Sequence, residues 1–392
     1  MKIRTGLALF VIVALFSKSA VVQTFDPYIQ SVVDQISIDT LQSNLQTLES
    51  FGRKQINDPG LENTAEWLMN KYSGYGYEDI ETNPFNFSGY STFNIIVTKQ
   101  GTSFPDQYVI IDGHYDTKTG PGVNDNGTGV AIILEIARLM ANIPTKYSIR
   151  FINFSAEEYG LIGSSHYVQN VVIPQNMAIR IVFNIDEVGG VQGMVNNIVV
   201  CERDESPPAY NNSESWAITD TLVALSGLYS GLIPEINLAY GSDYVPFQIN
   251  GEIITGIFEY NYSPYAHTIH DSLANLDLDY VYEMAKISVA AGMYFALADD
   301  PNTGNTGSRL FSDKISVIPD PGIHTIAVDL TGISGRYKFL LYDETGKLQL
   351  TDYLSSGQIN KIQASELSTG IYIYLIAGEG GEINKSGKMA WF

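Results

Sequence analysis

The sequence predicts an α/β protein: a three-layer sandwich whose central, mostly parallel sheet is flanked by helices, followed by a small C-terminal β-sandwich. Three observations predict this arrangement. Between residues 93 and 297, apolar runs typical of buried strands alternate with segments whose apolar residues recur at helical spacing. At residues 299–310 the composition changes to the Asp, Asn, Thr and Gly of a linker. Beyond it, short alternating segments separated by turn residues are typical of a β-sandwich.

The elements follow from these patterns in chain order. Helices are predicted at 29–36, 38–51 and 61–72, because their apolar residues lie three and four apart. The alternating region gives strands at 93–98, 108–111, 147–154, 179–185, 197–200 and 252–259, and helices at 130–142, 160–172, 216–228 and 278–297. Residues 204–215, with Pro, Asn and Ser, predict a surface loop. The C-terminal strands are predicted at 315–318, 324–330, 337–342, 348–353, 358–362, 370–377 and 386–392.

The N-terminus predicts export. Residues 1–19 have a basic start (Lys2 and Arg4), an apolar run and then small residues, which is the pattern of a signal peptide. We therefore expect residues 1–22 to be a leader, and no later stretch to span a membrane. The single cysteine, Cys201, excludes an intrachain disulfide, and export without disulfides suits a bacterial protein secreted or held at the outer cell surface.

The charge limits the classes of partner. The chain has 43 acidic and 22 basic residues, a net charge of -21. Such an excess argues against nucleic acid and against an anionic membrane surface as partners.

Acidic groups and histidines stand at the ends of three predicted strands. His114 and Asp116 follow the first strand, Glu157 and Glu158 the second, and Asp186 the third. Parallel strands present their carboxyl ends at one edge of a sheet, where ligands bind in open α/β folds. Carboxylates crowded there would repel one another unless cations lay among them.

The residue types indicate the metal. Imidazole and carboxylate ligands without thiolates suit zinc, and also cobalt or manganese. Two histidines and three carboxylates are enough for two ions that share a carboxylate. A further carboxylate is then needed to accept a proton from water, and the pair Glu157 and Glu158 supplies one ligand and one base.

Five motifs carry a family resemblance. They are Gly-His114-Tyr-Asp116, Asn-Asp125-Asn-Gly-Thr-Gly, Ser-Ala-Glu157-Glu158-Tyr-Gly, Asn-Ile-Asp186 and His267-Thr-Ile-His-Asp271. In order and spacing the chain from about residue 36 to 298 resembles the co-catalytic dizinc aminopeptidases related to the Vibrio and Streptomyces leucine aminopeptidases.

The resemblance implies a role for each matched residue. His114 and Asp186 would bind one zinc ion, Glu158 and His267 the other, and Asp125 would bridge them, with a cis peptide bond after it. Glu157 would be the general base for a metal-bridging water, and Asp116 would orient His114. His270 is the competing histidine, but the family's ligand is the one followed by Thr. Residues 23–298 would then be a catalytic domain that removes N-terminal residues from peptides with a free N-terminus.

The C-terminal residues, 311–392, resemble a second family. The segment Leu367-Ser-Thr-Gly370-Ile-Tyr372, followed by Lys385 and Lys388, is similar to the sorting domains of the Bacteroidetes type IX secretion system. This resemblance implies recognition by secretion machinery. A generic accessory sandwich is the alternative.

There are three alternatives to an aminopeptidase. The presence of all five candidate ligands argues against a glutaminyl-peptide cyclotransferase, which has the same fold but uses a single zinc ion, and against a non-catalytic binding protein, which would have lost ligands. A carboxypeptidase or dipeptidase stays open, because it would share the ligand set and differ in its pocket residues.

Overall fold

The structure is a computed structural model. It describes residues 25–239, 241–299, 315–320, 324–331, 335–343, 347–378 and 383–391. The predicted leader and most of the predicted linker lie outside these residues. Among the described helices, none has the length and apolarity needed to cross a membrane.

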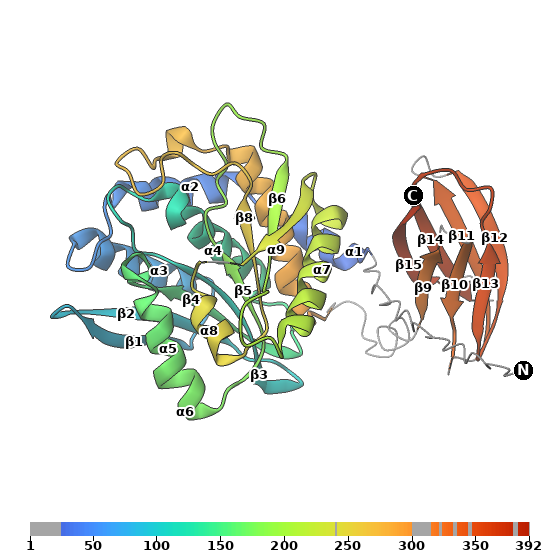
Figure 1. Ribbon diagram of the computed structural model, residues 1–392, viewed down its shortest axis with the longest axis horizontal. Coiled ribbons are helices and arrows are strands. Elements are labelled where there is room, and N and C mark those ends of the chain that lie inside the picture. The colour runs from blue at the N-terminus through green and yellow to red at the C-terminus, as the bar shows by residue number, and fades with distance from the viewer. Residues whose placement is uncertain are drawn as a thin grey trace, which may run out of the picture.

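An eight-stranded sheet forms the centre of residues 25–299, in the order β1-β2-β4-β3-β5-β8-β6-β7 (Figure 1). Strands β4, β3, β5 and β8 run parallel and the edge strand β1 shares their direction, whereas β2 on one side, and β6 with β7 on the other, run in the opposite direction. The α/β class is therefore confirmed, with a mixed sheet whose middle is parallel. The strands are β1 Ile80–Phe87, β2 Tyr90–Lys99, β3 Phe104–His114, β4 Tyr147–Phe154, β5 Ala178–Ile185, β6 Ile198–Arg203, β7 Ile233–Leu238 and β8 Ile254–Glu259.

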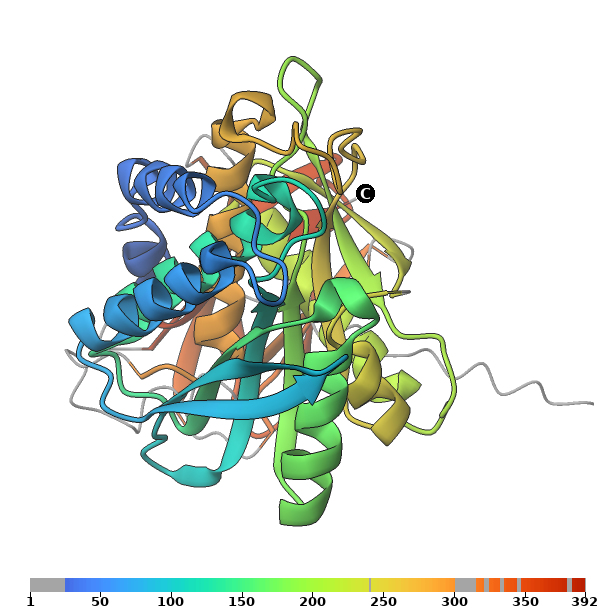
Figure 2. The same cartoon turned by 90° about the vertical axis from the view of Figure 1, so that its left-hand side faces the viewer.

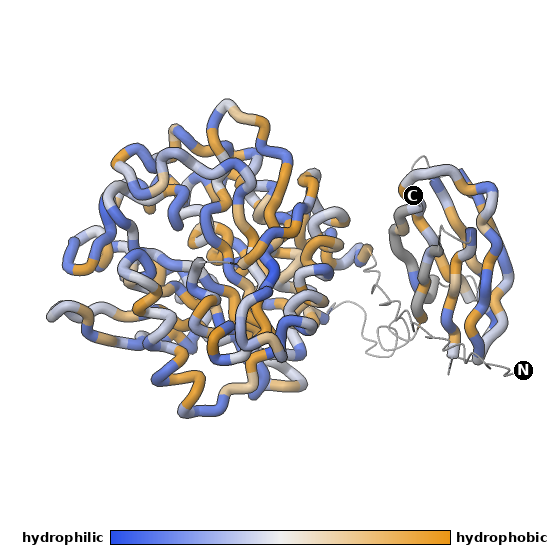
Figure 3. Tube along the Cα trace, in the orientation of Figure 1, coloured by the Kyte–Doolittle hydropathy of each residue, from blue (hydrophilic) through white to orange (hydrophobic). Residues whose placement is uncertain are grey.

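Helices cover both faces of this sheet (Figure 2). One face packs on α1 Pro27–Val33, α2 Ile38–Ser50, α3 Pro59–Gly74, α4 Gly129–Met140, α7 Asn212–Tyr229 and α9 Leu278–Phe295. The other face packs on α5 Ile162–Tyr167, η3 Val168–Val172 and α8 Val245–Asn250, and α6 Ile173–Gln175 follows η3. Figure 3 shows hydrophobic residues gathered along the central strands, where the two cores lie.

Most predicted elements are found within a few residues of their expected limits, and β4 has the predicted limits. The predicted helix 160–172 is wrong at its start, because Gly160 and Leu161 have positive φ values of 99° and 60° and α5 begins only at Ile162. The predicted loop 204–215 ends early, since α7 begins at Asn212.

Strands β1 and β7 were not predicted. Each lies at an edge of the sheet and lacks the buried apolar run on which the prediction of strands depends. Only Phe85 of β1 is buried, and β7 leaves Ile233, Ile236 and Leu238 exposed.

Residues 315–391 form two antiparallel sheets with their own core, as the predicted sandwich requires. One has the order β13-β10-β9 and the other β12-β11-β14-β15. Phe339 and Tyr374 stack between them with ring centroids 6.0 Å apart. The strands are β9 Ser316–Asp320, β10 Thr325–Asp329, β11 Arg336–Asp343, β12 Leu348–Ser355, β13 Ile359–Gln363, β14 Gly370–Gly378 and β15 Ile383–Trp391.

Candidate metal centre

The predicted site residues meet at the carboxyl edge of the parallel strands. His114 is the last residue of β3, Glu158 lies in the short helix η2 Glu157–Tyr159 after β4, and Asp186 directly follows β5. Asp125 lies in η1 Val123–Thr128, and His267 lies in the loop after β8. The topology thus brings together side chains that are up to 153 residues apart in the chain.

Two groups of candidate ligands share one carboxylate. His114, Asp125 and Asp186 form the first group, and Asp125, Glu158 and His267 form the second. His114 Nε2 lies 3.3 Å from Asp125 Oδ1 and 3.4 Å from Asp186 Oδ1. His267 Nε2 lies 3.0 Å from Asp125 Oδ2 and 3.1 Å from Glu158 Oε2. Asp125 therefore turns one oxygen toward each group, as a bridging carboxylate does.

The separations in the first group, 3.3 and 3.4 Å, fit a tetrahedral zinc ion, because ligand atoms at about 2.0–2.2 Å from such an ion lie about 3.3–3.6 Å from one another. Those in the second group, 3.0 and 3.1 Å, are slightly shorter than this range. Moreover, Glu158 Oε1 and Asp186 Oδ1 are buried and accept no hydrogen bond from the described residues. Buried carboxylate oxygens without donors are costly unless a cation or a proton compensates them.

The charges in the centre perturb one another. Burial and the charge of Asp125 raise the pKa of Glu158 to about 7. Burial also acts to raise the pKa of Asp125, but the hydrogen bonds of His114 and His267 outweigh it, and the pKa lies below its usual range. Neighbouring carboxylates, Asp186 foremost, raise the pKa of His114 against the effect of burial. Without a cation the centre therefore holds protons, which metal binding has to displace.

The carboxylate of Asp116 lies closer to the backbone of the neighbouring glutamates than to the ring of His114. Its Oδ1 accepts a hydrogen bond from the backbone N of Glu157 at 3.1 Å, and its Oδ2 from that of Glu158 at 3.3 Å. His114 Nδ1 is 3.7 Å from Asp116 Oδ1 but 3.1 Å from the backbone carbonyl oxygen of Asp116. The carboxylate thus fixes the turn that carries Glu157 and Glu158, while the backbone of Asp116 orients the imidazole.

Glu157, the predicted base, lies beside the first group without belonging to it. Its Oε2 is 3.9 Å from His114 Nε2. Burial raises the pKa of Glu157 to about 8, against the opposing effect of His114. A carboxylate with a raised pKa that is aimed at a metal centre is suited to accept a proton and return it.

Two further residues, which were assigned no role from the sequence, hold the ligands in place. Asp271 is buried, and its oxygens accept hydrogen bonds from the backbone N of Asn124 (2.7 Å) and of Asp125 (3.0 Å). Ser242 Oγ donates to Asp186 Oδ2 at 2.7 Å. Asp271 closes the fifth motif, so its place in that motif was the available signal. The peptide bond between Asp125 and Asn126 is cis, as the resemblance implied.

His270 is exposed and belongs to neither ligand group. His267 is also largely exposed, yet its ring reaches the second group. Of these two histidines, only His267 thus lies in a group of candidate ligands, and it is the one to which the resemblance assigns a zinc ion.

Glu202 is a buried acid outside the two ligand groups. Tyr244 donates a hydrogen bond to its Oε1 at 2.7 Å, and its Oε2 accepts none from the described residues. Burial raises the pKa of Glu202 to about 8. Burial therefore favours the protonated form of this carboxyl group.

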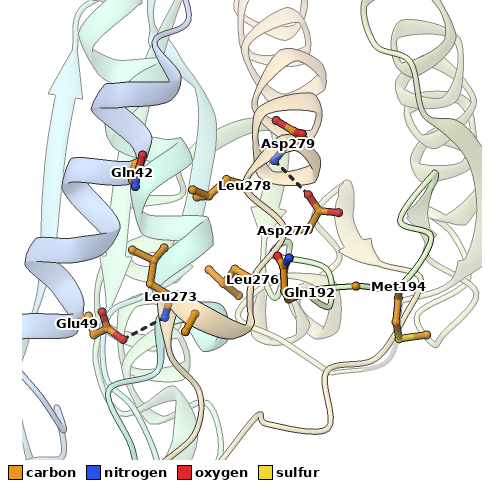
Figure 4. A pocket seen from close by; sticks show the side chains of 11 residues that line it. Gln42, Glu49, Gln192, Met194, Leu273, Leu276, Asp277, Leu278 and Asp279 are labelled. Atoms are coloured by element: carbon orange, nitrogen blue, oxygen red, sulfur yellow. Dashed lines mark hydrogen bonds between the residues drawn. The ribbon is translucent and has the colours of Figure 1, made fainter.

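A separate open pocket has a volume of about 790 Å³, and Figure 4 shows the side chains that line it. Its acidic side chains already cap backbone groups. Glu49 Oε1 accepts from Leu273 N at 3.0 Å, and Asp277 Oδ1 accepts from Asp279 N at 3.1 Å. The five candidate ligands do not line this pocket, so it does not compete as the metal centre.

Comparison with known proteins gives consistent matches. The sequence model of peptidase family M28 matches residues 94–292. Aminopeptidase YwaD of Bacillus subtilis strain 168 is 32% identical over 215 residues, which cover 52% of this chain and 45% of the relative. The aligned part thus spans less than half the length of this curated relative.

Solved structures share the fold. The LapA aminopeptidase of Legionella pneumophila superimposes with a TM-score of 0.61 at 23% identity, over 72% of this chain and 78% of that one. A glutaminyl cyclase of Macrostomum lignano gives the same TM-score of 0.61 at 15% identity, over 71% of this chain and 95% of the other. Identities this low indicate a common fold only.

Proposed function

Because the chain belongs to peptidase family M28, we propose that it is an exported zinc-dependent aminopeptidase that hydrolyses N-terminal residues from peptides. The observation that carries the proposal is the pair of ligand groups that share Asp125. A single-ion enzyme of this fold needs only one such group. Two complete groups support two zinc ions per chain, and hence the co-catalytic subtype of the Vibrio and Streptomyces enzymes.

The proposed reaction assigns a step to each group of residues. Bound zinc would supply Lewis acidity, which polarises a carbonyl, lowers the pKa of water and can hold a free amine. Glu157 would accept the proton of the attacking water and pass it to the leaving amine. Asp116 would hold the turn that carries Glu157 and Glu158 in place, because its carboxylate accepts hydrogen bonds from their backbone N–H groups.

Export is a separate part of the proposal. It rests on the leader pattern of residues 1–22, and for the C-terminal sandwich on the resemblance to type IX sorting domains. The fold of residues 315–391 is compatible with such a domain, and secretion machinery would be its partner. Fusing residues 311–392 to a reporter that carries a leader should send the reporter to the surface of a host with that system. A reporter retained in the periplasm would argue for an accessory sandwich.

The activity is tested with a panel of peptides. Purified protein is incubated with unblocked peptides, with the same peptides N-acetylated, and with a peptide that begins with Gln. Release of N-terminal residues from the unblocked peptides alone is the expected result. Cyclisation of the N-terminal Gln without hydrolysis would favour the glutaminyl cyclotransferase that the shared fold allows. Release from the C-terminus of acetylated peptides would favour a carboxypeptidase.

A further inference from the structure

Lys118 places a cation at the rim of the acidic centre. It lies in the loop between β3 and η1, and its Nζ donates a hydrogen bond to the backbone carbonyl oxygen of Glu158 at 2.6 Å. The same Nζ lies 3.9 Å from Glu158 Oε2, which in turn is 3.1 Å from His267 Nε2. The ammonium group therefore stands next to the second ligand group.

Hydrogen bonds from residues 54 and 55 hold the loop that carries Lys118. Thr117 N donates to Lys54 O at 3.2 Å, and Lys54 N donates to Thr117 Oγ1 at 2.8 Å. Gln55 Nε2 donates to the carbonyl oxygen of Lys118 itself. These contacts hold the backbone at Thr117 and Lys118, and the hydrogen bond to the carbonyl oxygen of Glu158 then places the ammonium group beside the centre.

Lys118 also keeps donors available for a ligand. An ammonium group has three N–H donors, and within the described residues Lys118 uses one in a hydrogen bond. Its side chain is 46% exposed, and the ring of Tyr159 lies 6.0 Å from Nζ. The nearby Arg53 differs, because its guanidinium group makes two hydrogen bonds to Asp58, at 2.6 and 3.2 Å.

The length of one peptide residue is similar to the distance between Lys118 and the second ligand group. If the scissile carbonyl lies between the two ligand groups, one residue of extended chain spans about 3.3–3.6 Å. Lys118 Nζ lies 3.9 Å from the candidate ligand oxygen Glu158 Oε2, so a carboxylate on one of the two residues that flank the scissile bond would come within range of Nζ. Such a carboxylate is either the C-terminus of a dipeptide or the side chain of an N-terminal acidic residue.

We propose that Lys118 selects substrates with a carboxylate next to the scissile bond. The proposal rests on the proposed peptidase function and adds the substrate class to it. An ammonium–carboxylate contact that is half exposed is worth about fivefold to tenfold in kcat/KM.

The test compares pairs of substrates that differ only in one carboxylate. The first pair is Leu-Ala and Leu-Ala-amide, and the second is Glu-Ala-amide and Gln-Ala-amide. The ratio of kcat/KM within each pair is measured for the wild type, Lys118→Gln, Lys118→Arg and Arg53→Gln. A ratio is insensitive to partial loss of zinc, because both substrates meet the same enzyme.

The wild type should favour the carboxylate in one pair by about fivefold or more, and that pair identifies the source of the carboxylate. Lys118→Gln should bring the ratio near one, Lys118→Arg should keep most of it, and Arg53→Gln should leave it unchanged. Equal ratios in the wild type and Lys118→Gln would overturn the inference, as would a wild type that discriminates in neither pair. If unblocked peptides are not hydrolysed at all, the proposed function fails first and the inference fails with it.

Discussion

Replacing Asp271 by alanine should weaken zinc binding although Asp271 is not a candidate ligand. Its carboxylate accepts the backbone N–H groups of Asn124 and Asp125, and it is buried. Each hydrogen bond to a charged acceptor is worth about 1.5–3 kcal/mol, so losing both should cost about 3–6 kcal/mol of stability. Zinc affinity should fall about 10-fold to 100-fold, because the bridging Asp125 loses its support.

The assay is a zinc titration in competition with a chelator, together with urea unfolding of the zinc-free protein. Asp277→Ala is the matched control, since Asp277 Oδ1 likewise accepts two backbone N–H groups, of Asp279 and Tyr280, at the start of α9. It should cost about 1 kcal/mol and leave zinc affinity unchanged. Equal zinc affinity in Asp271→Ala and the wild type would refute the role assigned to Asp271.

The remaining predictions concern catalysis, packing and pH. Glu157→Gln should abolish peptide turnover but retain zinc, as assayed by hydrolysis and metal analysis; an active variant would exclude Glu157 as base. Gly120→Ala should cost about 1–3 kcal/mol on unfolding and weaken zinc binding, because its Cβ would lie 2.0 Å from the carbonyl oxygen of Thr268, the residue after His267. Gly74→Ala, with open space around its Cβ, is the control and should be neutral or slightly stabilising. Glu202 has a raised pKa of about 8 in the fold against 4.5 unfolded, so the folded state binds this proton more tightly. The free energy of unfolding should therefore decline as pH rises from about 5 to 8, and Glu202→Gln should remove on the order of 3 kcal/mol of that decline, as measured by unfolding at several pH values. Parallel curves of unfolding free energy against pH for the wild type and Glu202→Gln would contradict the raised pKa of Glu202.

The sequence predicted the parts of the fold whose side chains are buried. Strand β4 was predicted to the residue because Ile149, Phe151, Ile152 and Phe154 are apolar and buried. The edge strands β1 and β7 were missed because their side chains remain in contact with water. Leu161 adopts a left-handed conformation that nothing in its side chain favours, so the late start of α5 was not predictable from the pattern.

The part of the candidate site that lies at the ends of the parallel strands was predictable from the sequence. His114, Glu158 and Asp186 follow strands of one parallel sheet, and the structure brings them together. Their ligand roles stay predictions. Hydrogen bonds to the backbone could not be predicted from the sequence, since they depend on the path of the loops. The hydrogen bonds that Asp116 accepts from Glu157 and Glu158, and the one that Asp271 accepts from Asp125, were therefore found only in the structure.

The central claim is that two metal sites share Asp125, and zinc stoichiometry tests it most directly. The purified full chain is saturated with zinc, freed of excess ion and weighed by native mass spectrometry. We expect two zinc ions per chain. A single zinc ion at saturation would contradict a pair of sites that share Asp125.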